Sequence, residues 1–485
     1  MIPLSLREVA AAVGGRLHAA DPATEVTAPA TLDSRAVPAG GLFVAVAGQH
    51  VDGHDYAAAA VEAGAVAVLA GHELDVPAVV VPDTTVALGR LAALVRTRLD
   101  GCTVVGLTGS QGKTGTKDLL AHLLAPAGSV VAPTGSYNNE LGVPLTLLRA
   151  DASTGFVVSE MGTRGPGQIR YLADIARPDV GLVLNVGVAH LGEFGSQSAI
   201  ALAKGELVEA LPAGGVAVLN ADDPLVSAMA ERTTARVVTF GTSGDADVRV
   251  HDMVLDDDGC PRFALDTGSG TVRVAMQLTG AHQAQNAAGA AAVALELGVP
   301  LADVGRLLST ATPVSRWRME RHERADGVLV VNDAYNANPD SMRAALQTVA
   351  VIGRGRGART VAVLGQMLEL GASADAEHDA VGRLAARLGI GRLVVVGEGA
   401  RALHLGASAE TGWEGDSVLV ADVDAAVEHL RHTVEPGDVV LVKASRASGL
   451  ERVATELLSG GGRRLPGDRD TAPGDDDAMP GGGTG

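Results

Sequence analysis

Short apolar runs alternate along this chain with helical and loop-like stretches, a pattern that predicts an α/β fold. We predict three domains and a tail, with boundaries at residues 1–98, 99–312, 313–458 and 459–485. The predicted strands lie at 42–46, 65–69 and 78–81, then from 103, at 155–160, 180–185 and 215–220, and finally at 328–331, 361–364, 393–396 and 439–442. In the third block each strand precedes a helical pattern, which predicts a parallel sheet. The tail is rich in Gly, Pro and Asp and is predicted to be disordered.

The most informative segment, residues 104–118, predicts a buried strand, a Gly-rich turn and the start of a helix. Such a turn directs backbone N–H groups and a helix N-terminus at one point, where a polyphosphate can bind. Lys113 supplies a cation for the outer phosphates, and Thr114 supplies a hydroxyl for Mg²⁺. Leu107 stands where the strict P-loop pattern has Gly, so the loop is a short one. We predict that ATP is bound by Thr108, Gly109, Ser110, Gln111, Gly112, Lys113, Thr114 and Gly115.

Composition and charge restrict the partners of this protein. The 485 residues are 47% hydrophobic and 20% charged, as in soluble globular proteins. A net charge of −19 argues against general binding to nucleic acids or to an anionic membrane, while small anionic substrates remain possible. Cys102 and Cys260 are too few for a disulfide framework or a zinc site. Because we find neither a secretory signal nor a membrane-spanning apolar run, we expect a cytoplasmic protein.

Three polar residues of the second block are candidates for a metal site. Glu160 ends a predicted strand and His190 follows another, and ligands gather at the carboxyl ends of strands in open α/β sheets. Glu160 is therefore a candidate ligand of Mg²⁺, directly or through water. Glu160 could equally cap a loop, and His190 could be a packing histidine, since Mg²⁺ prefers oxygen. Lys204 would by default be a solvated helix lysine.

Seven short segments stand in an order that is typical of one enzyme family. They are 33–35 (DSR), 108–114 (TGSQGKT), 138–146 (NNELGVPLT), 160–162 (EMG), 185–190 (NVGVAH), 204–206 (KGE) and 333–342 (DAYNANPDSM). This set resembles the Mur ligases, the ATP-dependent amino-acid-adding enzymes of peptidoglycan synthesis, from about residue 30 to 455. The first, third and last segments resemble the branch that adds D-alanyl-D-alanine. The resemblance implies an N-terminal domain for a UDP-sugar substrate, a central P-loop-type ATPase domain and a Rossmann-like C-terminal ligase domain.

The resemblance also implies roles for residues at matched positions. Lys113, His190 and Lys204 would be catalytic, and Thr114, Glu160, His190 and Lys204 would serve two Mg²⁺ sites. Lys204 would be carbamylated by CO₂, which turns a cation into an oxygen ligand. Further contacts to ATP would come from His282, Asn286, Arg316, Asp333 and Asn336. Contacts to the other substrates would come from Ser34, Arg35, Asn138, Asn139 and Asn338.

Two of these positions also have a purely structural interpretation. Asn338 precedes Pro339, and this pair suits the N-cap and first turn of a helix. Arg35 could pair with Asp33 and fix a turn instead of binding an oxyanion of the substrate. A strand followed by Gly-x-Gly-x-x-Ala at 397–402 resembles a dinucleotide-binding turn, but a lone match of this type is weak and also serves close helix packing.

Four residues depart from the family pattern, namely Gln111, Gly115, Gln366 and Ala444. Gly115 leaves the opening of a helix flexible, which costs about 0.5–1 kcal/mol relative to Ala. Gln366 stands where Asp is usual, and this weakens the expectation that its loop offers a carboxylate to the amino substrate. These departures bear on kinetic efficiency more than on the assignment.

By resemblance, the reaction is ADP-forming ligation of D-alanyl-D-alanine to UDP-N-acetylmuramoyl-tripeptide through an acyl phosphate. The product is the UDP-linked pentapeptide, so the enzyme would serve the cell wall and, through it, cell shape and division. We expect a monomer, and the third residue of the tripeptide stays open between diaminopimelate and lysine. The alternatives are a Mur ligase that adds the third residue, a folylpolyglutamate synthase and a non-enzymatic nucleotide-binding switch. The first lacks support because its usual Asp-Asn-Pro-Arg-type motif is absent.

Overall fold

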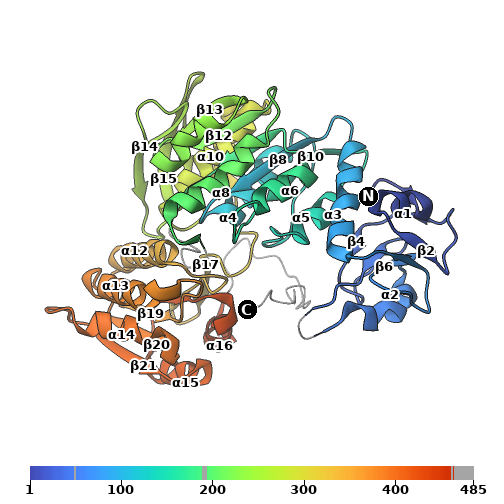
Figure 1. Ribbon diagram of the computed structural model, residues 1–485. Helices are drawn as coiled ribbons and strands as arrows, with labels where there is room; N and C mark the ends of the chain where they lie inside the picture. The colour runs from blue at the N-terminus through green and yellow to red at the C-terminus, as the bar shows by residue number, and fades with distance from the viewer. Residues whose placement is uncertain (49–50, 188–193, 460–461, 464–485) are drawn as a thin grey trace.

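The computed structural model describes residues 1–48, 51–187, 194–459 and 462–463, and they form three bodies in chain order. The first body (blue) and the third (orange to red) lie at separate sides of the central one (cyan to yellow) (Figure 1). Each body has its own main sheet, with helices packed on it. The α/β class with three main sheets in separate bodies, predicted from the sequence, is confirmed.

The first body is built on a five-stranded sheet with the order β2-β7-β6-β5-β4. Its strands are β2 (Arg16–His18), β4 (Ala30–Thr31), β5 (Leu42–Val44), β6 (Ala67–Ala70) and β7 (Ala78–Val80), with a separate ladder of β1 (Leu4–Ser5) and β3 (Glu25–Val26). Its helices are α1 (Leu6–Val13), α2 (Ala57–Ala63) and α3 (Thr84–Thr97). On α3, Arg96 pairs with Asp179 of the central body at 3.0 Å, so α3 joins the two bodies.

The central body has a nine-stranded sheet with the order β16-β15-β14-β13-β12-β11-β8-β10-β9. The strands are β8 (Thr103–Thr108), β9 (Ser129–Val131), β10 (Thr154–Glu160), β11 (Val180–Val183), β12 (Val216–Asn220), β13 (Arg236–Gly241), β14 (Val248–Leu255), β15 (Pro261–Thr267) and β16 (Gly270–Ala275). The helices are α4 (Lys113–Leu124), α5 (Gly142–Leu147), α6 (Gln168–Ala176), α8 (Gln197–Glu209), α9 (Pro224–Ser227), α10 (His282–Glu296) and α11 (Leu301–Thr310).

Strand β8 lies deep in this body because both of its faces are covered. Val105 and Leu107 point into a core with α4 and α10, while Val104 belongs to the core that holds α6 and α8. A strand buried on both faces must be apolar throughout, and this explains the continuous apolar run at its start. The phosphate loop therefore leaves the middle of the sheet, next to the ends of β10 and β11.

The third body has a seven-stranded sheet with the order β21-β20-β19-β22-β18-β17-β23. The strands are β17 (Glu320–Arg324), β18 (Leu329–Asn332), β19 (Thr360–Leu364), β20 (Arg392–Val396), β21 (Asp416–Val420), β22 (Val439–Lys443) and β23 (Gly462–Arg463). The helices are α12 (Pro339–Arg356), α13 (Ala374–Arg387), α14 (Arg401–Ser408), α15 (Val423–Thr433) and α16 (Glu451–Ser459).

The structure adds antiparallel strands that the sequence analysis did not predict. In the central body, β14, β15 and β16 form an antiparallel extension of the parallel strands. In the third body the predicted parallel arrangement holds from β18 to β22, but β17 turns back at Gly327 and pairs antiparallel with β18. These strands are partly exposed, so they lack the apolar runs on which the prediction depended.

The described part of the predicted tail is short. Ser459 ends α16, and residues 462–463 pair with β17 as β23, so these residues are ordered parts of the third body. The other residues of the tail lie outside the described part of the chain. Within the described part, no helix is both long enough and apolar enough to cross a membrane.

Candidate active site

A cleft of about 1050 Å³ lies between the central and third bodies. Its central-body wall includes the phosphate loop, and its third-body wall includes the segment before β17, the start of α12 and the loops that follow β18, β19 and β22. Most of the predicted site residues line it: Ser110, Gln111, Gly112, Lys113, Thr114, Gly115, Asn138, Asn139, Glu160, Lys204, His282, Asn286, Asp333, Asn336 and Asn338. The cleft thus brings together residues that are far apart in the sequence.

The phosphate loop depends on glycine and on a neighbouring loop. Gly112 precedes α4 with a φ of +81°, and a Cβ there would lie 2.4 Å from Oδ1 of Asn286. Only glycine fits this close approach. Asn185, after β11, accepts the Gln111 N–H at 3.0 Å through Oδ1 and the Ser110 N–H at 3.1 Å through its carbonyl. These contacts fix the loop before any phosphate binds.

Lys113 extends along this loop, and its Nζ donates to the Gly109 carbonyl at 2.7 Å. Loss of hydration lowers the pKa of Lys113, and the Arg318 charge lowers it further, while Glu160 opposes both effects. Gly109 and Thr108 were predicted to contact ATP, but neither lines the cleft. Thr108 is buried, and its Oγ1 has no hydrogen-bond partner among the described residues.

Glu160 is 1% exposed and lies at the centre of a polar cluster. Its Oε2 accepts a hydrogen bond from Thr114 Oγ1 at 3.0 Å, and its Oε1 accepts from Ser136 Oγ at 3.0 Å and Asn138 Nδ2 at 2.8 Å. A carboxylate beside hydroxyl groups fits Mg²⁺, which takes oxygen ligands. The described residues contain no group of three His, Cys, Asp or Glu side chains that could hold a metal ion alone. Phosphate oxygens and water would have to complete such a site.

Lys204 on α8 is the second lysine of the central wall and is 3% exposed. Its ammonium has no hydrogen-bond or ion-pair partner among the residues that the structure describes. Burial lowers its pKa well below the usual value, with a smaller effect of Lys113. A Cβ at the next residue, Gly205, would lie 1.8 Å from Arg232 Nη1, so a larger residue there would displace the Arg232 side chain. His190, the other predicted metal ligand, lies outside the described residues.

Lysine is rare in this chain: only Lys113, Lys117, Lys204 and Lys443 occur among 485 residues. Three of them line the cleft, and Lys117 is buried one turn into α4, where its Nζ donates to the Pro133 carbonyl at 2.5 Å. The exposed cationic side chains are arginines, whereas the four lysines lie at or beside the cleft.

On the third-body wall, Asp333 and Asn336 are joined by Lys443. Lys443 is 2% exposed; its Nζ donates to Asp333 Oδ2 at 2.6 Å and to the Asn336 carbonyl at 2.8 Å. The other oxygen of Asp333 accepts the Met319 N–H at 3.0 Å. Lys443 was not predicted from the sequence, although its place at the end of an apolar strand could have identified it.

The arginine that lines the cleft on this wall is not the one predicted from the sequence to contact ATP. Arg316 is exposed and does not line the cleft. Arg318 does, with its guanidinium carbon 4.2 Å from the centre of the Tyr335 ring. The intervening Trp317 has a φ of +58°, so the backbone reverses there, and spacing along a regular strand cannot predict the direction of the side chains.

His282 and Asn286 lie on α10, beside the phosphate loop. His282 is partly buried, and its buried Nδ1 has no hydrogen-bond partner in the described part of the chain. Burial lowers the pKa of His282, with Asp333 opposing and Lys443 assisting this shift. Asn286 donates to Gln283 Oε1 at 3.2 Å.

The asparagines predicted to bind substrate all have structural partners. Asn139 accepts the Gly142 N–H at 2.9 Å. Asn338 caps α12 and forms a capping box with Ser341, while Pro339 takes the first turn, so the structural interpretation of this pair is confirmed. Both asparagines still line the cleft, as does Asn138.

Ser34 and Arg35 lie in the first body and do not line this cleft. The Arg35 side chain is 66% exposed and pairs with Asp33 at 2.9 Å. Hydrogen bonds from Arg35 lower the pKa of Asp33. The turn-fixing pair therefore exists, but it is at the surface and not buried.

Gln366 packs near Gly399 and does not line the cleft. The carboxylate that this loop offers to the cleft is Glu369, whose backbone has a φ of +63°. The sequence analysis missed Glu369, as it missed Ser136, because both lie in irregular loops.

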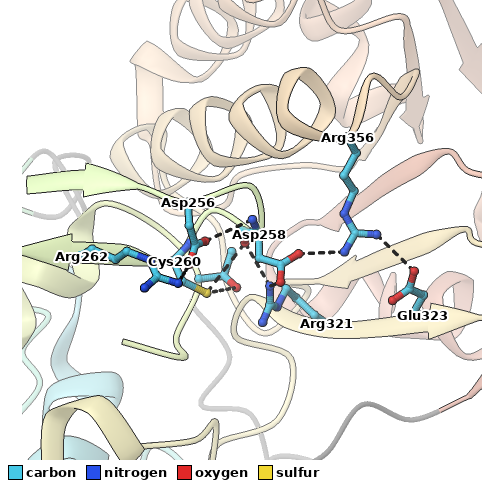
Figure 2. A network of polar contacts seen from close by, with 8 residues as sticks. Asp256, Asp258, Cys260, Arg262, Arg321, Glu323 and Arg356 are labelled. Atoms are coloured by element: carbon cyan, nitrogen blue, oxygen red, sulfur yellow. Dashed lines mark hydrogen bonds and ion pairs between the residues drawn. The ribbon is translucent and has the colours of Figure 1, made fainter. Parts of the chain in front are cut away.

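A polar network joins the two bodies beside the cleft (Figure 2). Asp258, in the turn between β14 and β15, accepts from Arg356 of α12 at 2.8 Å, and its carbonyl accepts from Arg321 of β17 at 3.0 Å. The Gly259 carbonyl accepts the Gly280 N–H at 2.8 Å, which connects this turn to the segment that leads into α10. The network therefore contributes to the position of the third body relative to the phosphate loop.

A phosphate loop on one body, facing fixed cations on another, defines a nucleotide-dependent enzyme with an active cleft shared by two domains. Residues 30–96 match the Mur ligase family catalytic domain, residues 107–294 the Mur ligase middle domain, and residues 317–446 the Mur ligase glutamate ligase domain. The UDP-N-acetylmuramoyl-tripeptide--D-alanyl-D-alanine ligases of Mycobacterium tuberculosis and Escherichia coli are 48% and 34% identical to this chain. These alignments cover 95% of this chain and 98% and 100% of the relatives.

Solved structures agree with these similarities. The first crystal structure of MurF from Acinetobacter baumannii has a TM-score of 0.84 and 31% identity, over 94% of this chain and 99% of that one. The MurF ligase of Thermotoga maritima in complex with ADP has a TM-score of 0.75 and 30% identity, over 90% and 98%. The chain belongs to the Mur ligase family and, within it, to the MurF branch.

Proposed function

We propose that this protein is an ADP-forming ligase that adds D-alanyl-D-alanine to UDP-N-acetylmuramoyl-tripeptide. The observation that carries the proposal is the cleft itself, in which Lys113, Thr114 and Glu160 face Arg318 and Asp333 of another body. The 48% identity to the M. tuberculosis ligase, over 95% of this chain, supports the choice of substrates. We infer a cytoplasmic monomer that makes the last soluble precursor of peptidoglycan and does not bind nucleic acid.

The reaction needs ATP because a carboxylate is a poor electrophile. Transfer of the γ-phosphoryl group to the tripeptide carboxylate gives an acyl phosphate, which the dipeptide amine attacks. Lys113 would leave the Gly109 carbonyl and stabilise the charge on the transferring group, together with the N-terminus of α4. His282, neutral at pH 7 because burial lowers its pKa, and Asn286 would border the nucleotide base. The shared cleft would hold the three reactants in line.

We infer that Mg²⁺ is held at Thr114 and Glu160, because these oxygens lie 3.0 Å apart beside Lys113. When bound, the ion neutralises the negative charge of the phosphates. Lys204 is inferred to be carbamylated, since a buried amine that has no partner among the described residues is easily neutral, and a neutral amine reacts with CO₂. The carbamate would give the central wall a second carboxylate-like group, suited to a second Mg²⁺ with His190.

The first body is inferred to bind the UDP-sugar part of the substrate. Ser34 and Arg35 lie there on a turn with an exposed guanidinium, outside the cleft that holds ATP. This position suits recognition of an anionic group at the far end of a long substrate.

Phosphate release by the purified protein tests the proposal. The protein is incubated with Mg-ATP, D-alanyl-D-alanine and UDP-N-acetylmuramoyl-tripeptides that end in diaminopimelate or lysine. We expect phosphate only when all three substrates are present, together with a product heavier than the tripeptide by one D-alanyl-D-alanine residue pair. Release with free diaminopimelate and a dipeptide substrate would identify the third-residue branch instead, and release with ATP alone would indicate a nucleotide switch.

A further inference from the structure

Arg446 is a cleft residue to which the reaction described above gives no role. It follows β22 in the third body and lines the cleft. Its guanidinium carbon lies 4.2 Å from the centre of the Trp317 ring, and its Nη1 lies 2.7 Å from Oε1 of Glu451. The ring and the carboxylate together restrain the position of the guanidinium.

The other two cations of this wall, Lys443 and Arg318, are placed differently. Lys443 is buried against Asp333, and Arg318 lies near enough to Lys113 to lower its pKa, which places it at the phosphate end. Arg446 is different, because 43% of its side chain is exposed. Its Nε and Nη2 form no hydrogen bond with the part of the chain that the structure describes. One edge of a fixed guanidinium therefore remains available, and such an edge matches a carboxylate bidentately.

We propose that Arg446 binds the terminal carboxylate of the incoming dipeptide. This inference rests on the proposed function. In that function the amine substrate is a dipeptide, with the reacting nitrogen at one end and a carboxylate at the other. Glu451 neutralises part of the Arg446 charge, so the site favours a single carboxylate over a polyphosphate. Leu368 and Ala447 line the cleft as well and offer apolar surface for the methyl groups. Holding the carboxylate there would position the amine at the other end.

A cycle with two proteins and two dipeptides tests this contact. We compare kcat/KM for D-alanyl-D-alanine and its C-terminal amide, using wild type and Arg446→Gln. In wild type the amide should be about 10- to 100-fold worse, as expected for loss of a charge-assisted pair. In Arg446→Gln the acid should lose about the same factor, and the amide should then differ from the acid by less than about threefold. The KM values for ATP and UDP-tripeptide should not change.

Control variants separate this contact from a general loss of charge or fold. Arg452→Gln, on an exposed arginine paired with Asp424 outside the cleft, should leave all four rates unchanged. Trp317→Leu, which removes the stacked ring, should lower the preference for acid over amide without abolishing turnover. Amidation that costs the same factor in wild type, Arg446→Gln and Trp317→Leu would overturn the proposal for Arg446. If wild type does not use D-alanyl-D-alanine at all, the proposed function fails instead.

Discussion

The two walls of the cleft hold their polar side chains in position in different ways. On the central wall, Glu160 accepts hydrogen bonds from Thr114, Ser136 and Asn138, and the loop before Lys113 is bonded to Asn185. On the third-body wall, arginines are held against aromatic rings, as Arg318 is against Tyr335. The central wall is thus built by backbone geometry and hydrogen bonds, whereas the third-body wall combines the buried Lys443–Asp333 pair with arginines that lie against aromatic rings.

This difference has a physical consequence for the reaction. A site that must receive Mg²⁺ and phosphate needs preorganised oxygen and N–H groups, because any reorganisation would cost free energy during phosphoryl transfer. A site that binds and releases substrate in each turnover can use arginines that lie against aromatic rings. The ring holds the guanidinium in place, and its N–H groups remain available to the substrate. We therefore expect changes on the central wall to affect kcat most, and changes elsewhere to affect binding.

The largest effect should follow from Lys113→Ala. This variant removes the only lysine of the phosphate loop, and loss of one such charge contact lowers kcat by about 10²–10³-fold. Steady-state phosphate release would measure the loss, and circular dichroism would check the fold. Lys113→Arg serves as the control that keeps the charge but changes its shape. Near-normal turnover in a folded Lys113→Ala protein would remove the phosphate loop from the mechanism.

The next effect concerns Lys204, the other lysine of the central wall. With ¹³C-labelled bicarbonate, wild type should show a carbamate resonance that is absent from Lys204→Ala, and ligation by this variant should fall by about 10–100-fold. Lys117→Arg is the control, since that lysine is buried outside the cleft. With only four lysines in the chain, assignment of the resonance is simple. A bare ammonium in Mg-nucleotide crystals grown with bicarbonate would contradict the prediction.

A smaller effect, confined to one substrate, is expected for Arg35→Ala in the first body. Loss of a charge-assisted contact should raise the KM for UDP-tripeptide about 10-fold and leave the KM values for ATP and D-alanyl-D-alanine nearly unchanged. Arg16→Ala, on another exposed arginine of the same body, provides the control. Equal changes for all three substrates, together with a lower melting temperature, would instead assign Arg35 to the turn that it forms with Asp33.

The smallest effect should come from Asp258→Asn, which weakens the network between the two walls. Partial burial raises the pKa of Asp258, but Arg356 and Arg321 outweigh this effect and hold the pKa below its usual value of 3.8. The ion pairs of Asp258 are therefore complete at neutral pH and are lost only as the pH falls below that value. We expect kcat to change by about threefold or less, with a wider distribution of interdomain distances by small-angle X-ray scattering. Asp266→Asn, on the same hairpin, should change neither quantity, and an unchanged scattering profile for Asp258→Asn would show that the network does not set the cleft.

The same contrast between the walls explains what could be predicted from the sequence. Lys113, Thr114 and Glu160 were found because they stand at fixed spacings after apolar strands. Arg318 was missed in favour of Arg316, because the backbone at Trp317 reverses and local spacing does not determine which arginine enters the cleft. Glu369 depends on a left-handed backbone residue in an irregular loop. Strands β14 to β16 were missed because their exposed positions interrupt the apolar pattern.

In the proposed reaction, the carboxylate of the UDP-tripeptide is phosphorylated before the amine attacks. This claim is tested by labelling both oxygens of that carboxylate with ¹⁸O and measuring the mass of the inorganic phosphate after complete turnover. An acyl phosphate intermediate requires one carboxylate oxygen to leave with the phosphate, so we predict one ¹⁸O atom in each phosphate released. Unlabelled phosphate, formed at the same rate as the pentapeptide, would contradict the mechanism.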